Sequence, residues 1–281
     1  MDKSRRNQII VKTLLILCML VITFFVLFPL YFVISTSLKS YSEYIRDPIG
    51  FDVSKLSLAN YKDVLTSSNM GRAFLNSIFI TAISVICTVI FAAIGSFAIT
   101  IINFSGSKIF AFLAIVTMFF TGELTYIPLY LVYSSLGLTN TYWVLIIPCF
   151  ICFPSLGLVL GSNYLGGVPR DIAEAAALDG AGFFTMFRRL YLPLMRPVIA
   201  LVAVMSFQSA WSEFFWPMIT TLGNQDVQTL PLLILGFSSA DSSLFGQYCA
   251  GLALMTLPMI VVYIFLSKYF IQGMTAGSVK L

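Results

Sequence analysis

The sequence contains no histidine, and this absence narrows the chemistry that the chain can carry out. Histidine is the side chain most often used as a general base near neutral pH and as a metal ligand. The phosphate-binding loop of nucleotide hydrolases, a glycine followed five residues later by Gly-Lys-Ser or Gly-Lys-Thr, is absent as well. We therefore expect a chain that is not an enzyme, with no metal site and no cofactor of its own.

Charged residues are also scarce, which excludes a soluble globular protein. They account for 10% of the chain, whereas 59% of the residues are hydrophobic and the mean hydropathy is +0.94. Soluble domains contain roughly 25% charged residues. The net charge is only +4 and no basic stripe is present, so nucleic acid is not an expected partner.

Long apolar runs are present instead, and they predict an all-α polytopic membrane protein with six transmembrane helices. A span needs roughly 20 residues, and the first run exceeds the roughly 7 to 15 apolar residues of a signal peptide, so we interpret it as a retained span. The polar residues 35–72 are predicted to be an extracytoplasmic loop with one or two short helices. All of this belongs to a single transmembrane domain, residues 1–281. The expected spans are about 13–34, 73–102, 109–133, 142–164, 197–221 and 244–270.

The distribution of basic residues predicts the orientation. If both ends of the chain are cytoplasmic, the inner segments carry most of the positive charge, in agreement with the positive-inside rule. Of the 16 basic residues, the inner ones would be Lys3, Arg5, Arg6, Lys12, Lys108, Arg170, Arg188, Arg189, Arg196, Lys268 and Lys280.

Residues 168–193 form a polar island between two apolar blocks. Pro169 suits the first position of a helix, and Asp171 and Glu174 place negative charge in its first turns. The alanines that follow have high helix propensity. Gly180 predicts the end of this helix, because glycine readily adopts the left-handed conformation that closes many helices.

A second short helix is predicted from Phe183 to Leu190, with Pro193 and Pro197 ending it. The island would then be a helix-turn-helix outside the bilayer, slim enough at its alanines to enter a groove on another protein. An ordinary solvated connection between two spans is the alternative, and the residues alone leave it open.

These residues resemble a known signature, the EAA motif of binding-protein-dependent ABC importer permeases. Leu190 stands where that motif usually has isoleucine. The matching segments are Glu174-Ala175-Ala176, Asp179-Gly180 and Leu190-Tyr191-Leu192-Pro193. Further segments resemble the sugar permeases of the maltose-system type, namely Ile127-Pro128-Leu129-Tyr130, residues 136–142, Thr229-Leu230-Pro231 and residues 273–280. The resemblance covers nearly the whole chain and implies the type I ABC importer fold.

The resemblance implies that the segment 165–196 is a cytoplasmic loop whose helix docks into a cleft on a cytosolic ATPase dimer, which binds the ATP and Mg²⁺. The residues implied in this coupling are Glu174, Ala175, Ala176, Asp179, Gly180, Arg188, Leu192 and Pro193. The cytoplasmic tail 271–281 would also reach the ATPase, through Thr275, Ala276, Gly277 and Lys280. A frayed chain end is the alternative for the tail.

Acidic residues inside the spans indicate a substrate path, since a buried charge usually faces a cavity or a partner. Glu123 and Glu213 are the two candidates. Spacing predicts that the residues around Glu213 share one helical face, and aromatic rings beside hydrogen-bonding groups suit sugars. The members of this face are Gln208, Trp211, Ser212 and Phe215. The family commonly has asparagine where Ser212 stands. An interfacial aromatic belt with a hydrogen bond between helices is the alternative.

The sequence thus predicts one permease subunit of an ABC importer in a bacterial cytoplasmic membrane. The expected substrate is a carbohydrate, in particular an oligosaccharide. The expected partners are a second permease subunit, an ATPase dimer, an extracytoplasmic sugar-binding protein and membrane lipid. Two alternatives remain, an importer of glycerol phosphate or another polar solute, and a secondary transporter driven by an ion gradient.

Overall fold

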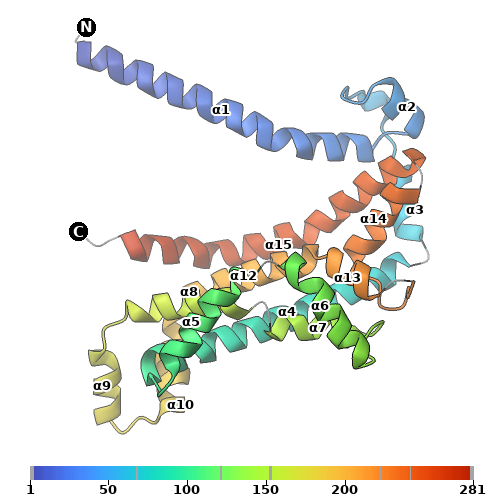
Figure 1. Cartoon of the computed structure of the whole chain (residues 1–281). Coiled ribbons are helices and arrows are strands. Elements are labelled where there is room, and N and C mark those ends of the chain that lie inside the picture. Colours follow the sequence, from blue (N-terminus) through green and yellow to red (C-terminus); the bar gives the residue numbers. More distant parts are fainter. Residues whose placement is uncertain are drawn as a thin grey trace. The chain divides into compact units, whose positions relative to one another are not determined.

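The computed structural model describes residues 3–67, 69–120, 122–151, 154–221, 223–240 and 242–278, and every regular element in these ranges is a helix (Figure 1). The predicted all-α class is therefore confirmed. The chain divides into two compact units. One comprises Met1–Ser68 and Ile234–Thr256, and the other comprises Asn69–Leu233 and Leu257–Leu281. The single permease domain stays a prediction.

The first unit begins with a long helix whose side chains are suited to lipid. Helix α1 (Lys3–Ser37) is exposed along its apolar stretch, and its segment Val11–Ser37 is long and apolar enough to cross a membrane. Within the predicted loop 35–72, the short helices are α2 (Tyr41–Arg46), η1 (Val53–Lys55) and α3 (Ala59–Thr66). The buried Lys39 ammonium donates to the carbonyl oxygens of Asp47 and Pro48, at 2.9 and 3.2 Å, and so fixes the course of this loop.

In the second unit, most helices are shorter than the spans predicted from the sequence. Helix α4 (Met70–Phe97) continues into a π-helical turn (Ala98–Ile102) and agrees with the predicted second span. The helices that follow are α5 (Ser107–Thr117), α6 (Gly122–Ser135), α7 (Tyr142–Ile151), α8 (Pro154–Gly166), α12 (Arg196–Ser212) and α13 (Phe215–Thr220). The predicted third and fifth spans are thus each divided into two helices, and α7 and α8 are the described parts of the fourth.

The structure does not confirm the count of six spans. Three helices in the described residues are long and apolar enough to cross a membrane, Val11–Ser37, Met70–Ile102 and Phe245–Ser267, and a bent pair would make a fourth. The hydropathy of the sequence does not show these helix breaks, because the residues at them are either apolar or too few to lower the local average. Helix α14 (Leu230–Ala240) was not predicted, and α15 (Phe245–Ser278) extends beyond the predicted sixth span.

The island forms two helical segments, as predicted, but with different ends. Helix α9 (Asp171–Leu178) begins two residues after Pro169, and Gly180 closes it with a φ of 77°. Helix α10 (Phe183–Met186) runs through a π-helical turn (Phe187–Tyr191) into α11 (Leu192–Leu194). The predicted stop at Pro193 and Pro197 is wrong. Each proline lies in the first turn of a helix, where its missing N–H costs no hydrogen bond.

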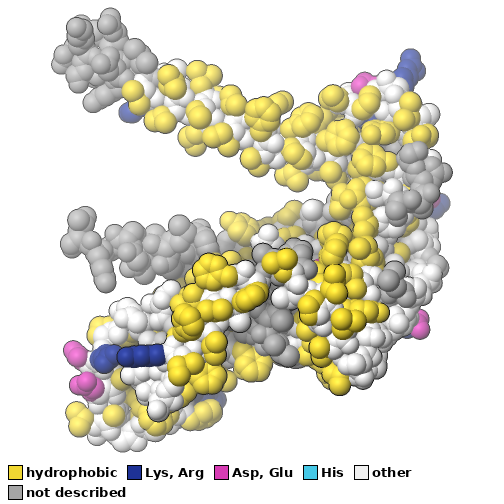
Figure 2. Space-filling model, viewed as in Figure 1, with side chains coloured by type: hydrophobic (Ala, Val, Ile, Leu, Met, Phe, Trp, Pro, Cys, Tyr) yellow, Lys and Arg dark blue, Asp and Glu magenta, His cyan; other side chains and the backbone are white. Residues whose placement is uncertain are grey.

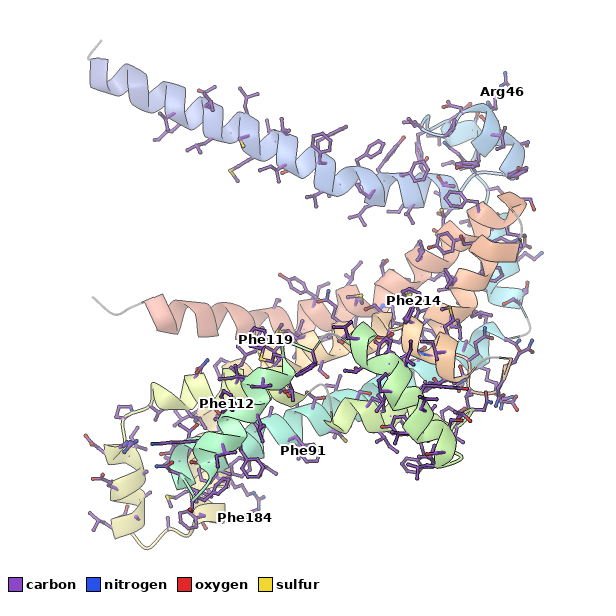
Figure 3. The ribbon with its side chains drawn as sticks, in the orientation of Figure 1. Arg46, Phe91, Phe112, Phe119, Phe184 and Phe214 are labelled. Carbon is purple, nitrogen blue, oxygen red and sulfur yellow. The ribbon has the colours of Figure 1, made fainter. Side chains whose placement is uncertain are left out.

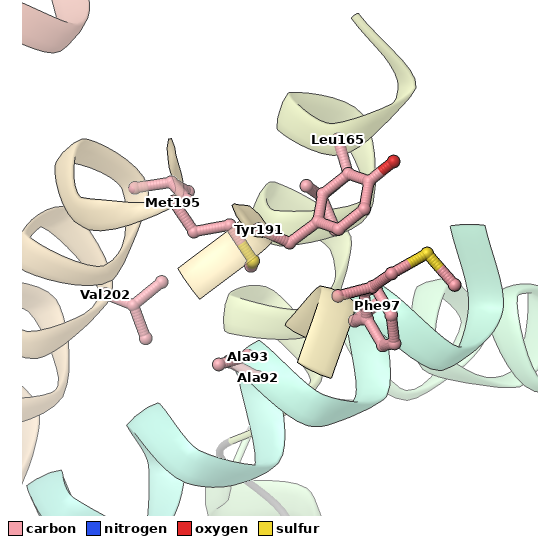
Figure 4. Packing of buried hydrophobic residues seen from close by; sticks show 9 residues of the cluster. Ala92, Ala93, Phe97, Leu165, Tyr191, Met195 and Val202 are labelled. Atoms are coloured by element: carbon pink, nitrogen blue, oxygen red, sulfur yellow. The ribbon is translucent and has the colours of Figure 1, made fainter. Parts of the chain in front are cut away.

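The core of the second unit lies where α4, α8 and α12 pack together beside the island (Figure 4). The ring of the fully buried Tyr191 lies 5.2 Å from the ring of Phe97, and Leu165 and Met195 complete this cluster. Glycines on α8 allow the helices to approach closely. A Cβ on Gly161 would lie 2.8 Å from the Cβ of Ser96, so the contact leaves no room for a methyl group.

We expect Gly161→Ala to lower the stability of the protein, because the added methyl group must push α8 away from α4. Overpacking of this kind costs about 1–3 kcal/mol. The measurement is the thermal unfolding midpoint in detergent. Gly166→Ala on the same helix is the control, since no atom lies within 4 Å of its added Cβ. Equal midpoints for the two variants would contradict the close packing of α4 and α8.

Candidate functional site

A cavity of about 650 Å³ lies inside the second unit. Its wall is formed by α4, α5, α6, α7, α8, α12 and α13. Sites for small ligands commonly measure roughly 300–1,000 Å³. The polar side chains in its lining are Ser84, Thr88, Thr117, Thr125, Tyr126, Ser155, Ser206, Ser209, Glu213 and Thr229. Among the described lining residues Glu213 is the only one with a formal charge, and none is Lys or Arg.

Glu213 lies at the break between α12 and α13, and its carboxylate accepts hydrogen bonds from backbone N–H groups that the break leaves without a helical partner. The residue has an extended conformation, with φ of −68° and ψ of 118°. Its Oε1 accepts from the backbone N–H groups of Phe215 and Trp216, at 2.9 and 3.0 Å. Its Oε2 accepts from the hydroxyl of Tyr126 on α6, at 3.1 Å. One carboxylate therefore caps α13 and connects it to α6.

Trp216 holds α13 against the neighbouring helices. Its side chain is buried, and its Nε1 donates to the carbonyl oxygen of Val144 on α7, at 2.7 Å. The rings of Tyr126 and Tyr133 on α6 lie 5.3 and 6.0 Å from its ring. The position of the Glu213 carboxylate is thus determined by buried contacts on both sides of the break.

The predicted substrate path is placed only in part. Glu213 lines the cavity, whereas Gln208, Trp211, Ser212 and Phe215 do not belong to its lining. Gln208, Trp211 and Ser212 share a face of α12 by their spacing, but Phe215 does not belong to it, because α12 ends at Ser212 and Phe215 begins α13.

Trp211 in particular is a packing residue. Its side chain is buried, and its ring stacks on Phe207 at 5.6 Å and meets Phe74 edge-on at 6.1 Å. Glu123 lies in the first turn of α6, and its side chain is outside the described part of the structure.

The sequence interpretation missed two cavity residues on α12, Ser206 and Ser209. They are three residues apart, which places them on one face of α12, and Glu213 follows directly after the end of that helix. Small hydroxyl residues at that spacing before an intramembrane acid were the available signal. The prediction from the aromatic residues favoured the opposite face of α12, which carries Gln208 and Trp211.

At the end of the second unit away from α6 and α7, the helix α9 exposes a charged surface (Figures 1 and 2). Glu174, Ala175 and Asp179 are exposed, while Ala176 is half-buried and packs against the core cluster. Leu178 is 89% exposed, and Phe184 on the neighbouring α10 is 74% exposed (Figure 3). Two large apolar side chains beside a charged helix are typical of a surface that another protein covers.

The other residues implied in coupling connect α9 to the cavity. Arg188 and Pro193 are exposed, whereas Leu192 packs against the core cluster. The helical segment Phe183–Leu194 meets α12 at a bend of 75°. The island is thus joined through this bend to the helix that carries Ser206 and Ser209.

The structure does not test the role of the tail. Thr275, Ala276 and Gly277 lie in the last turns of α15, and their side chains are outside the described part, as is the whole of Lys280. No group of three or more metal-ligating side chains occurs among the described residues.

A polar network closes the other end of the second unit. The Asn76 side chain at the start of α4 donates to the carbonyl oxygens of Asp226 and Gln228, at 3.0 and 2.9 Å. The Tyr142 hydroxyl donates to Asn76 Oδ1 at 2.8 Å, and Arg72 forms an ion pair with Asp226. The segment that follows α13 is thereby fixed to α4 and α7.

Broken helices around a cavity, with an exposed helix joined to one wall of it, fit the architecture of a transport permease. Residues 104–276 match the family of inner membrane components of binding-protein-dependent transport systems. This match covers more than half of the chain, which therefore belongs to that family. The resemblance inferred from the EAA motif is confirmed.

Individual relatives agree. The chain is 28% identical over 280 residues to the arabinooligosaccharides transport system permease protein AraQ of Halalkalibacterium halodurans, covering 99% of both chains. It is 31% identical over 233 residues to the osmoprotective compounds uptake permease protein GgtD of Synechocystis sp., covering 82% of this chain and 77% of that one.

A solved structure shares the fold. It belongs to a bacterial ABC transporter involved in the import of the acidic polysaccharide alginate. The TM-score is 0.80 at 23% sequence identity, with 96% of this chain and 99% of that chain covered. The predicted ABC importer permease fold is confirmed.

Tyr164, just before the island, and Tyr191, within it, allow a test of the contacts that fix the island to the rest of the second unit. The Tyr164 hydroxyl donates to the carbonyl oxygen of Leu194 at 2.9 Å, whereas the buried Tyr191 hydroxyl has no partner among the described residues. We expect Tyr164→Phe to lower the unfolding midpoint in detergent, and Tyr191→Phe to leave it unchanged or raise it. A hydrogen bond contributes about 1 kcal/mol, whereas an unsatisfied buried hydroxyl costs about 1–3 kcal/mol. The opposite order of the two midpoints would contradict this assignment.

Proposed function

We propose that this chain is one transmembrane subunit of an ATP-driven ABC importer for a carbohydrate, in particular an oligosaccharide. It works by alternating access, in which ATP-dependent movement of the island opens the cavity to one side of the membrane and then to the other. The observation that carries the proposal is the continuity between the exposed island and the cavity-lining α12 across a single bend of 75°.

The ATPase contact is assigned to the exposed face of α9. Glu174 supplies a carboxylate for a charge-assisted hydrogen bond, and Ala175 allows the close approach of another protein. Gly180 supports the sharp turn that presents this helix, because its φ of 77° disfavours any other residue. Asp179, Arg188 and the tail residues Thr275, Ala276, Gly277 and Lys280 are assigned to the same contact. ATP and Mg²⁺ bind to the partner ATPase dimer, and this chain contributes no catalytic residue.

The remaining partners follow from the family and the fold. Dependence on a binding protein, which the family description states, requires an extracytoplasmic partner. We assign its docking to the end of the second unit where the side chain of Asn76 is hydrogen-bonded to the backbone of Asp226. A second permease subunit completes the pathway. Both chain ends are cytoplasmic in this proposal, in a bacterial cytoplasmic membrane.

A carbohydrate is favoured over glycerol phosphate by the lining of the cavity. A phosphate group is usually bound by Arg, by Lys or by a helix N-terminus. The described lining residues include no Arg or Lys, and Glu213 already occupies the N-terminus of α13. The many hydroxyl groups suit a substrate that is itself rich in hydroxyls.

We expect Glu174→Ala to leave the importer assembled while reducing coupled ATPase activity and uptake about tenfold, the effect of losing one charge-assisted hydrogen bond. The measurements are ATP hydrolysis and sugar uptake in vesicles that contain the complete importer with its binding protein. Asp171→Ala removes another exposed acid of the same helix and is the matched control. Equal losses in both variants would mean that net charge, rather than the position of Glu174, determines the contact. Unchanged uptake with Glu174→Ala would refute its assignment.

A further inference from the structure

We propose that the cavity of this subunit binds one uncharged sugar unit of the transported molecule, with Oε2 of Glu213 accepting a hydrogen bond from one of its hydroxyl groups. This inference rests on the proposed carbohydrate import and goes beyond it, because it assigns a binding site to this chain and a charge class to the ligand.

The first argument comes from the two oxygens of Glu213. A carboxylate offers about four acceptor positions. Two backbone N–H groups engage Oε1, and the Tyr126 hydroxyl engages Oε2. Oε1 is therefore saturated by its role in capping α13. Oε2 retains one acceptor position, and the residue is half-buried in the cavity lining.

The second argument comes from the hydroxyl groups near this carboxylate. Ser84, Thr117 and Thr125 donate to backbone carbonyls of their own helices. Ser206 and Ser209 make no such bond within the described part of the chain, although both line the cavity. From Ser206 to Ser212, where α12 ends beside Glu213, the rise of the helix spans about 9 Å, enough for one sugar ring.

The hydroxyl group of Thr229 is a third polar group that lines the cavity without a hydrogen-bond partner in the described part of the chain. The side-chain oxygen of Thr229 has no hydrogen-bond partner among the described residues, the residue is 4% exposed, and it belongs to the cavity lining. Leaving a buried hydroxyl unsatisfied costs about 1–3 kcal/mol. A small rotation of the threonine towards a bound hydroxyl group would recover this hydrogen bond.

The apolar part of the wall suits the other face of a sugar ring. Tyr126 is half-buried at the cavity and is backed by Phe215, whose ring lies 5.8 Å away in a stacked arrangement. Sugars present C–H groups on one face, and aromatic rings bind such faces well. A rigid tyrosine beside an acceptor carboxylate therefore provides both contacts that a sugar ring needs.

The charge of the cavity selects against acidic sugars. Glu213 is the only formally charged residue in the described lining, so a uronic acid would meet a like charge without a compensating cation. An amino sugar would gain less than the sign of the charge suggests, because three donors already share the carboxylate. Uncharged sugars are the class that this lining accommodates.

The test is protection of an introduced thiol in the assembled importer. Ser209→Cys places a thiol in the cavity, and its labelling by a small maleimide is measured with increasing concentrations of a trisaccharide. The probes are raffinose and arabinotriose, an alginate trisaccharide, and a chitosan trisaccharide. Ser135→Cys, at the exposed end of α6 and outside the cavity lining, is the control. The native cysteines are replaced by alanine in both variants.

We expect a neutral trisaccharide to protect Ser209→Cys but not Ser135→Cys, and the alginate trisaccharide to protect neither. Adding Glu213→Gln should weaken the protection about tenfold, as expected for losing a hydrogen bond to a charged acceptor. Adding Tyr126→Phe should leave the protection unchanged or strengthen it, since the ring is kept and a competing donor is removed from Oε2. Glutamine retains a carbonyl oxygen that can cap α13, and unchanged assembly of the importer verifies this.

Uptake of the same sugars by the unmodified importer is measured in parallel, so that the two proposals can fail separately. If a neutral sugar is taken up but does not protect Ser209→Cys, this site is refuted and carbohydrate import stands. If the alginate trisaccharide protects as well as the neutral probes, or is the sugar taken up, the assigned charge class is wrong. If no sugar in the panel is taken up or protects, carbohydrate import and the site are both refuted.

Discussion

Helix breaks inside a membrane protein are subject to one constraint, which is that every exposed backbone N–H group needs a hydrogen-bond acceptor where water is scarce. At the break between α12 and α13 the side chain of Glu213 meets this need. Its carboxylate accepts two N–H groups of the new helix and the hydroxyl of Tyr126. The same charge that makes the break possible also gives the cavity its most polar group. Removing the acid would therefore change the backbone and the site together.

The break divides the second unit into two packing regions. Helix α12 packs against α4 and α8, where Gly157 and Gly161 permit close approach. Helix α13 packs against α6 and α7, where Trp216 donates to Val144. The cavity receives side chains from both regions. The two regions meet at Glu213.

The island packs against helices that also line the cavity. The segment Phe183–Leu194 is anchored by Tyr191, whose ring packs on Phe97 of α4. Exposed Leu178 and Phe184 leave the outer surface of the island available to a partner. Helix α9 has an acid and small residues on its exposed face and packs its other face against the core cluster, so a partner protein can contact it from one side.

Composition and motif alone determined the class of this protein, its helical character, the family and the helix-turn-helix of the island, because these depend on hydropathy and on local residue types such as Gly180. The positions of the helix breaks could not be read from the sequence. A break such as the one after Ser212 depends on an acceptor supplied by Glu213 and on a donor from α6, which is 87 residues away along the chain. For the same reason the cavity face of α12 was predicted on the wrong side. Only the tertiary structure decides which face meets a neighbour, and it turned the serines rather than Trp211 towards the cavity.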